Sequence, residues 1–511
     1  MRTSYSNNSI TKASGTILSA CLLLLIIAGG ASCKKFLSTY SQNETFLKTT
    51  EDLQEVLVGE GYYGSAGFAV APVFMDIIDD DAEDNKEARP SLERVYLYQN
   101  LYQWQALPFT NSVGEPITET YYLSQYRRMM ALNTILENIP AVQQNGGSAE
   151  ELKRISGEAH FLRGLINFNL ANVYGLPYKT STAGSDWSIP LKISAAVEDK
   201  QFTRNTVQQV YDQILKDLLE SEKELAGKKQ LTVKASQAAA QALLSRVCLF
   251  MEKYDEAISW ADKAMAQKDY AMTDLNTLPN TASVNSRTST ETFFCFPNIG
   301  FQTAITETFA PSNFVHQSDN FRASGDLMSL YSSTDLRKSR YFTLALSSEW
   351  IPSKMQPEVS VLDKSVIRYS ELLLNKAEAQ AILGRNNEAA ETIQELRKHR
   401  FKPADLTVVT ATGAALVNFI RDERRRELSF EMHRWFDLRR YAVNNAYPFS
   451  KTIRHIAYSY SGGVRYIQGY FELNPYEQDK AAYVIPIPLQ EVEFSQGGLV
   501  NPTRPVRPMK N

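Results

Sequence analysis

The stretch RDERRRELSFEMHRWFDLRRY, residues 421–441, is the most informative part of this chain of 511 residues. Residues of opposite charge recur there at steps of three and four, so a helix over the stretch would bring them together along one side. The recurring charged residues are Arg424, Glu427, Glu431 and Arg434. Beside them, Leu428, Met432 and Trp435 follow the same steps and form a face that can be buried. Periodicity alone therefore favours a solvated charged ridge over a hydrophobic seam.

Two details of this stretch have both a structural and a functional interpretation. The arginine run at residues 424–426 could bind phosphate, but Glu423 and Glu427 flank it, so internal pairing is the better interpretation. His433 could act as a general base, but a packed or capping histidine is expected here. We therefore expect these residues to support the fold.

The first residues form a targeting segment. Arg2 and Lys12 precede an apolar run that ends near Gly30 and is shorter than the roughly 20 residues of a membrane span. Small residues then lead to Cys33, which predicts a lipoprotein signal peptide over residues 1–32 and a lipidated Cys33. Cys21 ends a better lipoprotein motif but lies before the apolar run, and an ordinary secretory signal is a further alternative.

Composition excludes several classes of protein. The net charge of −3 provides no general attraction to nucleic acid. The five histidines are scattered and no CxxC pair is present, so we expect no metal centre and no cofactor. Cys248 and Cys295 lie in apolar surroundings, which is typical of small buried side chains without a disulfide framework.

Helical patterns dominate the first half of the mature chain. Helices are expected over residues 122–139, where Pro140 ends the pattern, and over residues 152–174, where Gly175 follows. Thr206 and Gln209 form a capping box that opens a third helix. An alanine-rich helix is expected over residues 235–250, with another starting at residue 254.

A repeat is found by shifting the sequence by 132 residues, which lays residues 242–265 on residues 374–397. Both copies read as a helix, a short polar turn, and then Glu-Ala opening a second helix. This pattern resembles the tetratricopeptide hairpin, although the copies are not contiguous.

Two long segments interrupt the helical pattern, at residues 76–108 and from about residue 276 to residue 357. Long irregular segments in a compact protein are usually functional loops. The first holds an acidic cluster at Asp79, Asp80, Asp81, Glu83 and Asp84. That cluster could bind calcium but lacks the spacing of an EF-hand, so a solvated turn is the favoured alternative.

Catalytic motifs such as GxSxG, HExxH or a phosphate-binding glycine loop are missing from the sequence, so we expect a binding protein rather than an enzyme. Aromatic rings in loops can stack on sugar rings or on peptide side chains. The candidate ligand-binding residues are Trp104, Phe301, Phe314 and Trp350. For each of them alone, a position in the core remains the alternative.

The wording of residues 421–441 resembles the signature of the SusD/RagB family, nutrient-binding lipoproteins of the Bacteroidota outer membrane. Further segments resemble it at residues 324–342, 369–379, 484–488 and 501–502. Met432 departs from the pattern, because the family usually has glycine there. The resemblance implies a mostly α fold for residues 33–511. In that fold, one domain of tetratricopeptide-like helix pairs carries long irregular loops in an α/α superhelix.

By the same resemblance, the protein would be anchored on the outer membrane, at the cell surface, and would capture a nutrient. The nutrient would be an oligosaccharide or a peptide, and a SusC-like TonB-dependent β-barrel transporter would receive it. Two alternatives remain open. A surface glycoside hydrolase would need a pair of carboxylates across a cleft, which the sequence does not exclude. A repeat adaptor would bind a partner protein and no nutrient.

Overall fold

The structure is a computed structural model that describes residues 47–63, 72–84, 98–198, 201–279, 282–299, 321–344, 349–354, 361–461 and 464–511. From Thr49 to Asn511 the chain forms one compact unit, and the preceding unit, Met1–Lys48, lies almost wholly outside the described residues. Cys33 belongs to that preceding part. Within the described ranges, no helix is long and apolar enough to cross a membrane.

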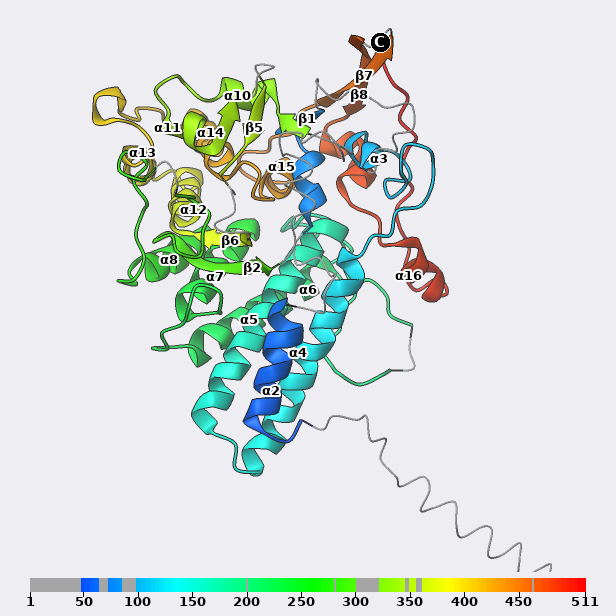
Figure 1. Ribbon diagram of the computed structural model, residues 1–511, viewed down its shortest axis with the longest axis vertical. Coiled ribbons are helices and arrows are strands. Elements are labelled where there is room, and N and C mark those ends of the chain that lie inside the picture. Colours follow the sequence, from blue (N-terminus) through cyan, green and yellow to red (C-terminus); the bar gives the residue numbers. More distant parts are fainter. Residues whose placement is uncertain are drawn as a thin grey trace, which may run out of the picture. The chain divides into compact units, whose positions relative to one another are not determined.

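Helices are the predominant regular elements of the unit, as Figure 1 shows. The N-terminal helices are α2 (Thr50–Val56), α3 (Gln99–Tyr102), α4 (Tyr121–Gln144), α5 (Ala149–Tyr174), α6 (Val207–Glu224), α7 (Gln237–Phe250) and α8 (Tyr254–Met265). The later helices are α10 (Gly325–Ser329), α11 (Leu336–Tyr341), α12 (Tyr369–Ile382), α13 (Asn386–Lys398), α14 (Gly413–Leu428), α15 (Arg434–Ala442) and α16 (Leu489–Phe494). The expected mostly α fold is confirmed.

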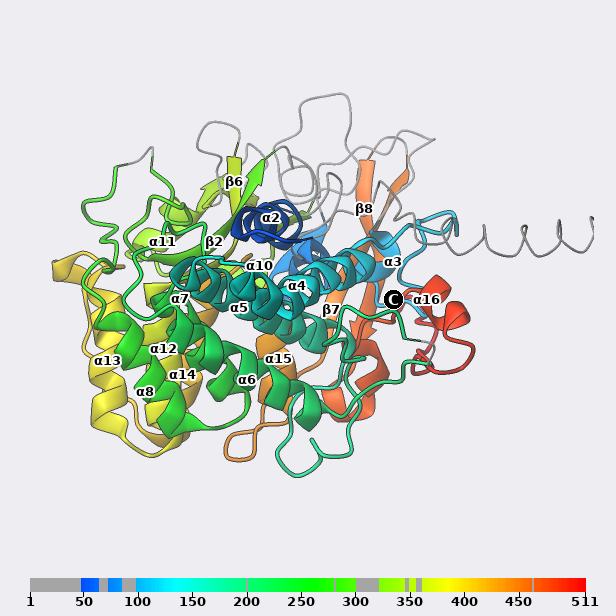
Figure 2. The same ribbon diagram turned by 90° about the horizontal axis from the view of Figure 1, so that it is seen from below.

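The long helices pack in a continuous row, each against the next, from α4 through α5, α6, α7 and α8 to α12 and α13 (Figure 2). The pairs α7–α8 and α12–α13 are the two copies of the sequence repeat. Ala261 and Ala264 of the first copy are fully buried, as are Ile393 and Leu396 of the second. The predicted tetratricopeptide-like helix pairs are therefore confirmed.

Small residues set the close approach between α5 and α6. A Cβ atom added at Gly164 would lie 2.9 Å from Cδ2 of Leu218, and one at Gly157 would lie 2.7 Å from Cγ of Leu225. Any larger side chain at either position would push the helices apart, because packed interiors leave no spare volume.

Local signals placed most helix ends correctly. Gly175 follows the last residue of α5, and Thr206 and Gln209 form the predicted capping box of α6. The expected end of the first helix at Pro140 is wrong, because α4 includes Pro140 and continues to Gln144. Pro140 lies near the C-terminal end of α4. The backbone hydrogen bond that proline cannot donate is therefore missing only there, and the rest of the helix is unaffected.

The strands form two-stranded antiparallel sheets rather than one large sheet. The strands are β1 (Ala82–Asp84), β2 (Thr292–Ile299), β3 (Phe321–Ala323), β4 (Phe342–Leu344), β5 (Trp350–Pro352), β6 (Val361–Arg368), β7 (Ile453–Ser461) and β8 (Val464–Leu473). They pair as β1–β3, β2–β6, β4–β5 and β7–β8. β1 to β5 lie in the segments that interrupt the helical row, and the pairs β1–β3 and β2–β6 join strands that are far apart in sequence.

The predicted continuous helix over residues 421–441 is wrong. The chain leaves α14 after Leu428 and enters α15 at Arg434. Between the helices, Phe430 has φ 57° and Met432 has φ 63°, which is the left-handed region. Glycine adopts this conformation without a steric cost, which is the physical reason for a glycine where this chain has Met432.

Side chains from distant segments donate hydrogen bonds to the last carbonyl groups of α14. The hydroxyl of Tyr331 donates to the carbonyl oxygen of Arg426 at 2.7 Å. Lys354 Nζ and Arg368 Nη2 both donate to the carbonyl oxygen of Glu427, at 2.9 and 2.7 Å. The last carbonyls of a helix have no partner within the helix, so the end of α14 serves as an attachment point for the loops.

Candidate functional site

A buried carboxylate at the end of α14 ties three distant segments together. Glu427 Oε1 accepts from Arg400 Nη2 at 2.8 Å and from Arg368 Nη1 at 2.7 Å. Its Oε2 accepts from Arg400 Nε at 2.9 Å and from Arg337 Nη1 at 3.3 Å. Although burial alone would raise it, the arginines hold the pKa of Glu427 well below its usual value. The loops are thereby fixed on the helical row by charge-assisted hydrogen bonds.

The interpretation of residues 421–441 as a solvated charged ridge is wrong, because Arg424 and Glu427 are fully buried. The expectation that the arginine run pairs internally is confirmed. Arg424 Nε lies 2.8 Å from Asp437 Oδ2, and Arg426 Nη2 lies 2.9 Å from Glu423 Oε1. Each of these charges is neutralised within the protein.

His433 is a packed histidine, as expected. It is buried between α14 and α15, and its Nδ1 lies 3.4 Å from Arg424 Nη2. Burial, reinforced by nearby Arg246 and Arg424, lowers the pKa of His433 well below its usual value. The imidazole is therefore neutral at pH 7, and its Nδ1 can accept a hydrogen bond from Arg424.

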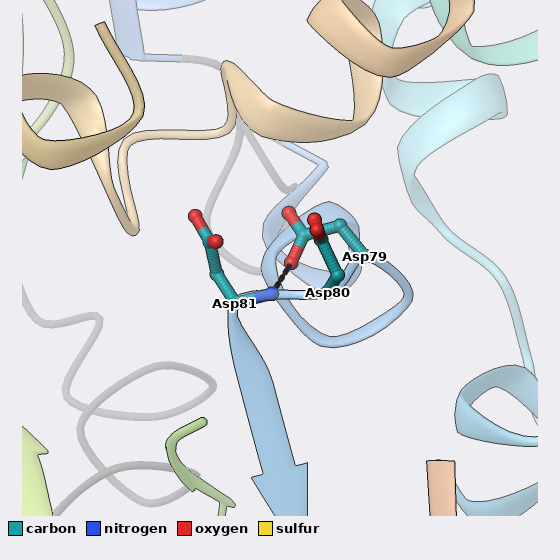
Figure 3. A group of neighbouring side chains, drawn as sticks. All are labelled: Asp79, Asp80 and Asp81. Carbon is teal, nitrogen blue, oxygen red and sulfur yellow. Dashed lines mark hydrogen bonds between the residues drawn. The ribbon is translucent and has the colours of Figure 1, made fainter. Parts of the chain in front are cut away.

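Three consecutive carboxylates, Asp79, Asp80 and Asp81, gather just before β1 (Figure 3). The favoured interpretation of a solvated turn is wrong, since all three are buried. Asp80 lies 2.7 Å from Arg434 Nε and 2.6 Å from Lys451 Nζ. Although burial alone would raise it, these pairs and the one with Arg425 hold the pKa of Asp80 well below its usual value.

The cluster is the acidic half of an ion-pair network. Arg425 Nε donates to Asp81 Oδ1 at 2.6 Å, and one oxygen of Asp79 accepts the backbone N–H of Asp81 at 2.8 Å. Burial, with Asp81 and Asp80 nearby, raises the pKa of Asp79 well above its usual value. The oxygens of Asp80 and Asp81 Oδ1 are thus already used in ion pairs with Arg425 and Arg434.

Above this network lies a pocket of about 410 Å³, here called the loop-side pocket. Its walls come from β1, from the start of α10 and from residues 451–456 of the β7 region. Lys451 Nζ bridges Asp80 and Asp326 across it, 2.6 and 3.1 Å from their Oδ2 atoms. Charged side chains held in fixed pairs offer several donors and acceptors to a polar ligand without leaving a net charge.

The hairpin β7–β8 extends one wall of this pocket. Arg454 lies over the ring of Tyr470, 4.8 Å from its centroid, and pairs with Glu472 at 2.9 Å. The hydroxyl of Tyr458 donates to Glu83 Oε1 at 3.2 Å. The Arg454 side chain is 63% exposed, so this wall offers an accessible guanidinium group.

Trp104 lies beneath the loop-side pocket and not in it. It is 1% exposed, and its indole N–H donates to the carbonyl oxygen of Ile78 at 2.8 Å. The ring of His455 is stacked between Trp104 and Tyr102, with centroids 4.0 Å away on each side. Trp104 is one of the predicted ligand contacts, and here the alternative of a core position applies, because its side chain is buried, stacked on His455 and bonded through its N–H.

Of the other predicted ligand contacts, only Trp350 lies within the described residues. Trp350 is half-buried on β5, with Lys338 Nζ 5.4 Å from its ring centroid, and it does not line the loop-side pocket. Phe301 and Phe314 lie outside the described residues, as does Cys33.

Sequence reasoning missed the hairpin residues Arg454, Tyr458 and Tyr470. A signal was present in the run IRHIAYSYSGGVRYIQGYFEL, residues 453–473, where tyrosines alternate with small or polar residues around Gly-Gly. Alternation around a glycine turn predicts a β-hairpin with one ring-bearing face.

Comparisons with known proteins agree with this architecture. A family model described as SusD family matches residues 352–502, and one described as starch-binding associating with outer membrane matches residues 36–249. A curated SusD-like protein of Formosa agariphila is 34% identical over 113 residues, which are 20% of this chain and 20% of that protein. The match therefore spans about a fifth of that relative.

Solved structures resemble the fold over most of its length. A SusD superfamily protein of Bacteroides thetaiotaomicron is 21% identical with a TM-score of 0.67, covering 89% of this chain and 100% of the other. A SusD-like carbohydrate binding protein of Bacteroides vulgatus is 19% identical with a TM-score of 0.67, covering 89% and 98%. On the two family models, which match residues 36–249 and 352–502, the chain belongs to the SusD family.

Proposed function

We propose that this protein is an outer-membrane lipoprotein that binds an oligosaccharide at the loop-side pocket and passes it to a transporter without chemical change. The observation that carries the proposal is a polar pocket lined by charged side chains that are held in ion pairs, with the exposed guanidinium group of Arg454 on one wall. Sugar hydroxyl groups bind to such side chains because these donate and accept hydrogen bonds in fixed positions. The relatives described as starch-binding or carbohydrate binding support the same ligand class.

The binding test is calorimetric titration of the full chain, kept in a sugar-free detergent, against oligosaccharides and peptides. Arg454→Ala is expected to weaken binding at least about tenfold, because a hydrogen bond to a charged group contributes about 1.5–3 kcal/mol. Arg385→Ala is the matched control, since Arg385 is also exposed and paired, with Asp255. Equal affinities for the two variants would reject the loop-side pocket as the binding site.

Catalysis is tested in the same samples. The proposal expects every bound oligosaccharide to be recovered intact, which chromatography of the ligand after overnight incubation measures. Shortened products would favour the alternative of a surface glycoside hydrolase. Binding of a transporter with no binding of any nutrient would favour the adaptor.

The anchor is proposed at Cys33, with residues 1–32 removed as signal peptide and residues 33–511 forming the mature domain. The support is sequence alone: the apolar run followed by Gly-Ala-Ser-Cys. Cys33→Ser should abolish acylation and release the protein from membranes, whereas Cys21→Ser should leave both unchanged. Mass spectrometry of the mature N-terminal peptide measures this, and an unmodified Cys33 in wild type would reject the anchor. Protease shaving of intact cells tests exposure at the cell surface.

The proposed receiver is a SusC-like TonB-dependent barrel, and the support is family membership. Co-purification of the tagged full chain from its own outer membrane should bring down a single barrel of that type in stoichiometric amount. A tagged lipoprotein of another family is the control.

A further inference from the structure

A second cavity opens on a different part of the unit, between the N-terminal end of α4 and α16. Its volume is about 550 Å³, which lies within the range of about 300–1,000 Å³ typical of small-molecule sites. Residues near Pro190 and Phe202 close one side of it. It shares no lining residue with the loop-side pocket and is called the α16 groove below.

Aromatic rings line the α16 groove. Tyr122 and Tyr126 of α4 form a tilted pair with centroids 4.7 Å apart, and the hydroxyl of Tyr126 donates to the carbonyl oxygen of Pro190 at 2.8 Å. This hydrogen bond fixes the position of the Tyr126 ring in the wall of the groove. Phe202 is half-buried in the groove, while Phe494 at the end of α16 is 87% exposed. An aromatic ring left in water beside a cavity is positioned to cover an apolar ligand face.

Polar side chains without partners face the same space. Gln201, Glu491 and Gln496 line the groove, and none of their side chains makes a hydrogen bond or ion pair with another described residue. Lys192, by contrast, is held by Glu198 at 3.1 Å and by the carbonyl oxygen of Ala196 at 2.5 Å. The described residues of the groove therefore offer the amides of Gln201 and Gln496 and the carboxylate of Glu491 to a ligand, and Lys192, the cation among them, is already paired.

We propose that the α16 groove is a second binding site, for an uncharged oligosaccharide. Rings for the apolar faces of the sugar, together with amide and carboxylate groups for its hydroxyls, match a neutral pyranose chain. An anionic sugar would bring like charge against Glu491, and among the described lining residues no free cation balances it. The inference rests on the proposed function in taking sugars as the ligand class, but it uses residues separate from the loop-side pocket.

The test is calorimetric titration of the full chain in sugar-free detergent with maltohexaose, cellohexaose, xylohexaose, mannohexaose and hexagalacturonate. Wild type should bind at least one neutral hexasaccharide at two sites. Phe494→Ala and Gln496→Ala should each reduce the stoichiometry from two to one, or weaken one site at least about tenfold. Val506→Ala is the control, because Val506 is also an exposed apolar side chain, at 77%, and lies outside the groove.

The two sites fail in different ways. A single site that is lost in Arg454→Ala and unchanged in Phe494→Ala would overturn the second site and leave the proposed function. Silence toward all five hexasaccharides would overturn both. Tighter binding of hexagalacturonate at the groove would also overturn the proposal. The proposal would also be overturned if the groove bound no sugar while Phe494→Ala weakened co-purification with the transporter. The groove would then be a docking surface for the transporter.

Discussion

Replacing Glu427 by glutamine is the sharpest test of how the loops are attached to the helical row. The substitution keeps the shape of the side chain but removes one negative charge from three buried guanidinium groups, those of Arg337, Arg368 and Arg400. Breaking a buried ion pair from one side costs about 3–5 kcal/mol, because the remaining charge stays buried without compensation. We expect Glu427→Gln to lose that much free energy of unfolding.

The assay is thermal unfolding at pH 7, followed by circular dichroism. An unfolding entropy of about 2.1 cal/mol/K per residue, over a unit of this size, converts each kcal/mol into about 1 °C, so a fall of about 3–5 °C is expected. Asp255→Asn is the control: it breaks the exposed pair with Arg385 and should change the free energy by less than about 1 kcal/mol. A Glu427→Gln protein as stable as the control would refute the reasoning, since the arginines would then be held by other groups.

Further predictions concern the turn between α14 and α15 and the helical row. Burial raises the pKa of the Asp76 carboxyl from 3.8 to about 7 in the folded state. The folded state therefore binds this proton more tightly than the unfolded state, and the resulting stability is lost as pH rises through 7. The Asp76→Asn side chain can still accept the N–H of Met432 but carries no charge. Its free energy of unfolding relative to wild type should therefore rise by about 2–3 kcal/mol from pH 5 to pH 8, measured by urea unfolding. A gain independent of pH would contradict this. Met432→Gly should raise stability by up to about 1 kcal/mol by relieving φ 63°, and Met432→Ala should not. Gly164→Leu should lower the unfolding temperature by about 1–3 °C, because its side chain would overlap Leu218 and overpacking costs about 1–3 kcal/mol. An unchanged temperature would mean that α5 and α6 can separate freely.

Local features of the fold were predictable from sequence. The capping box at Thr206 and the end of α5 before Gly175 depend on hydrogen bonds within a few residues, which any reader of the chain can find. The repeat was also visible, because helix pairs bury the same face in each copy. Pro140 shows the limit of local rules, since packing of α4 against α5 outweighs the preference of one proline near a helix end.

The candidate site was less predictable, because its residues meet only in space. Asp80 lies 354 positions from Arg434 in sequence yet accepts hydrogen bonds from its Nε and Nη2 atoms. Trp104 likewise stacks on His455, which lies near the C-terminal end of the chain. A tryptophan in an irregular segment has the same sequence signature whether it faces water or a histidine ring. The acidic run before β1 likewise read as solvated because its arginine partners were not adjacent.

The sequence by itself determined the family, the mostly helical class and the repeated helix pair, because these depend on period and short motifs. Tertiary structure alone decided that residues 421–441 form two helices with left-handed residues between them, and that their charges are buried. The physical reason is that Glu427 and Asp80 are stabilised by guanidinium groups delivered from distant segments. The balance between the desolvation of a charge and its compensation is fixed only when those segments meet.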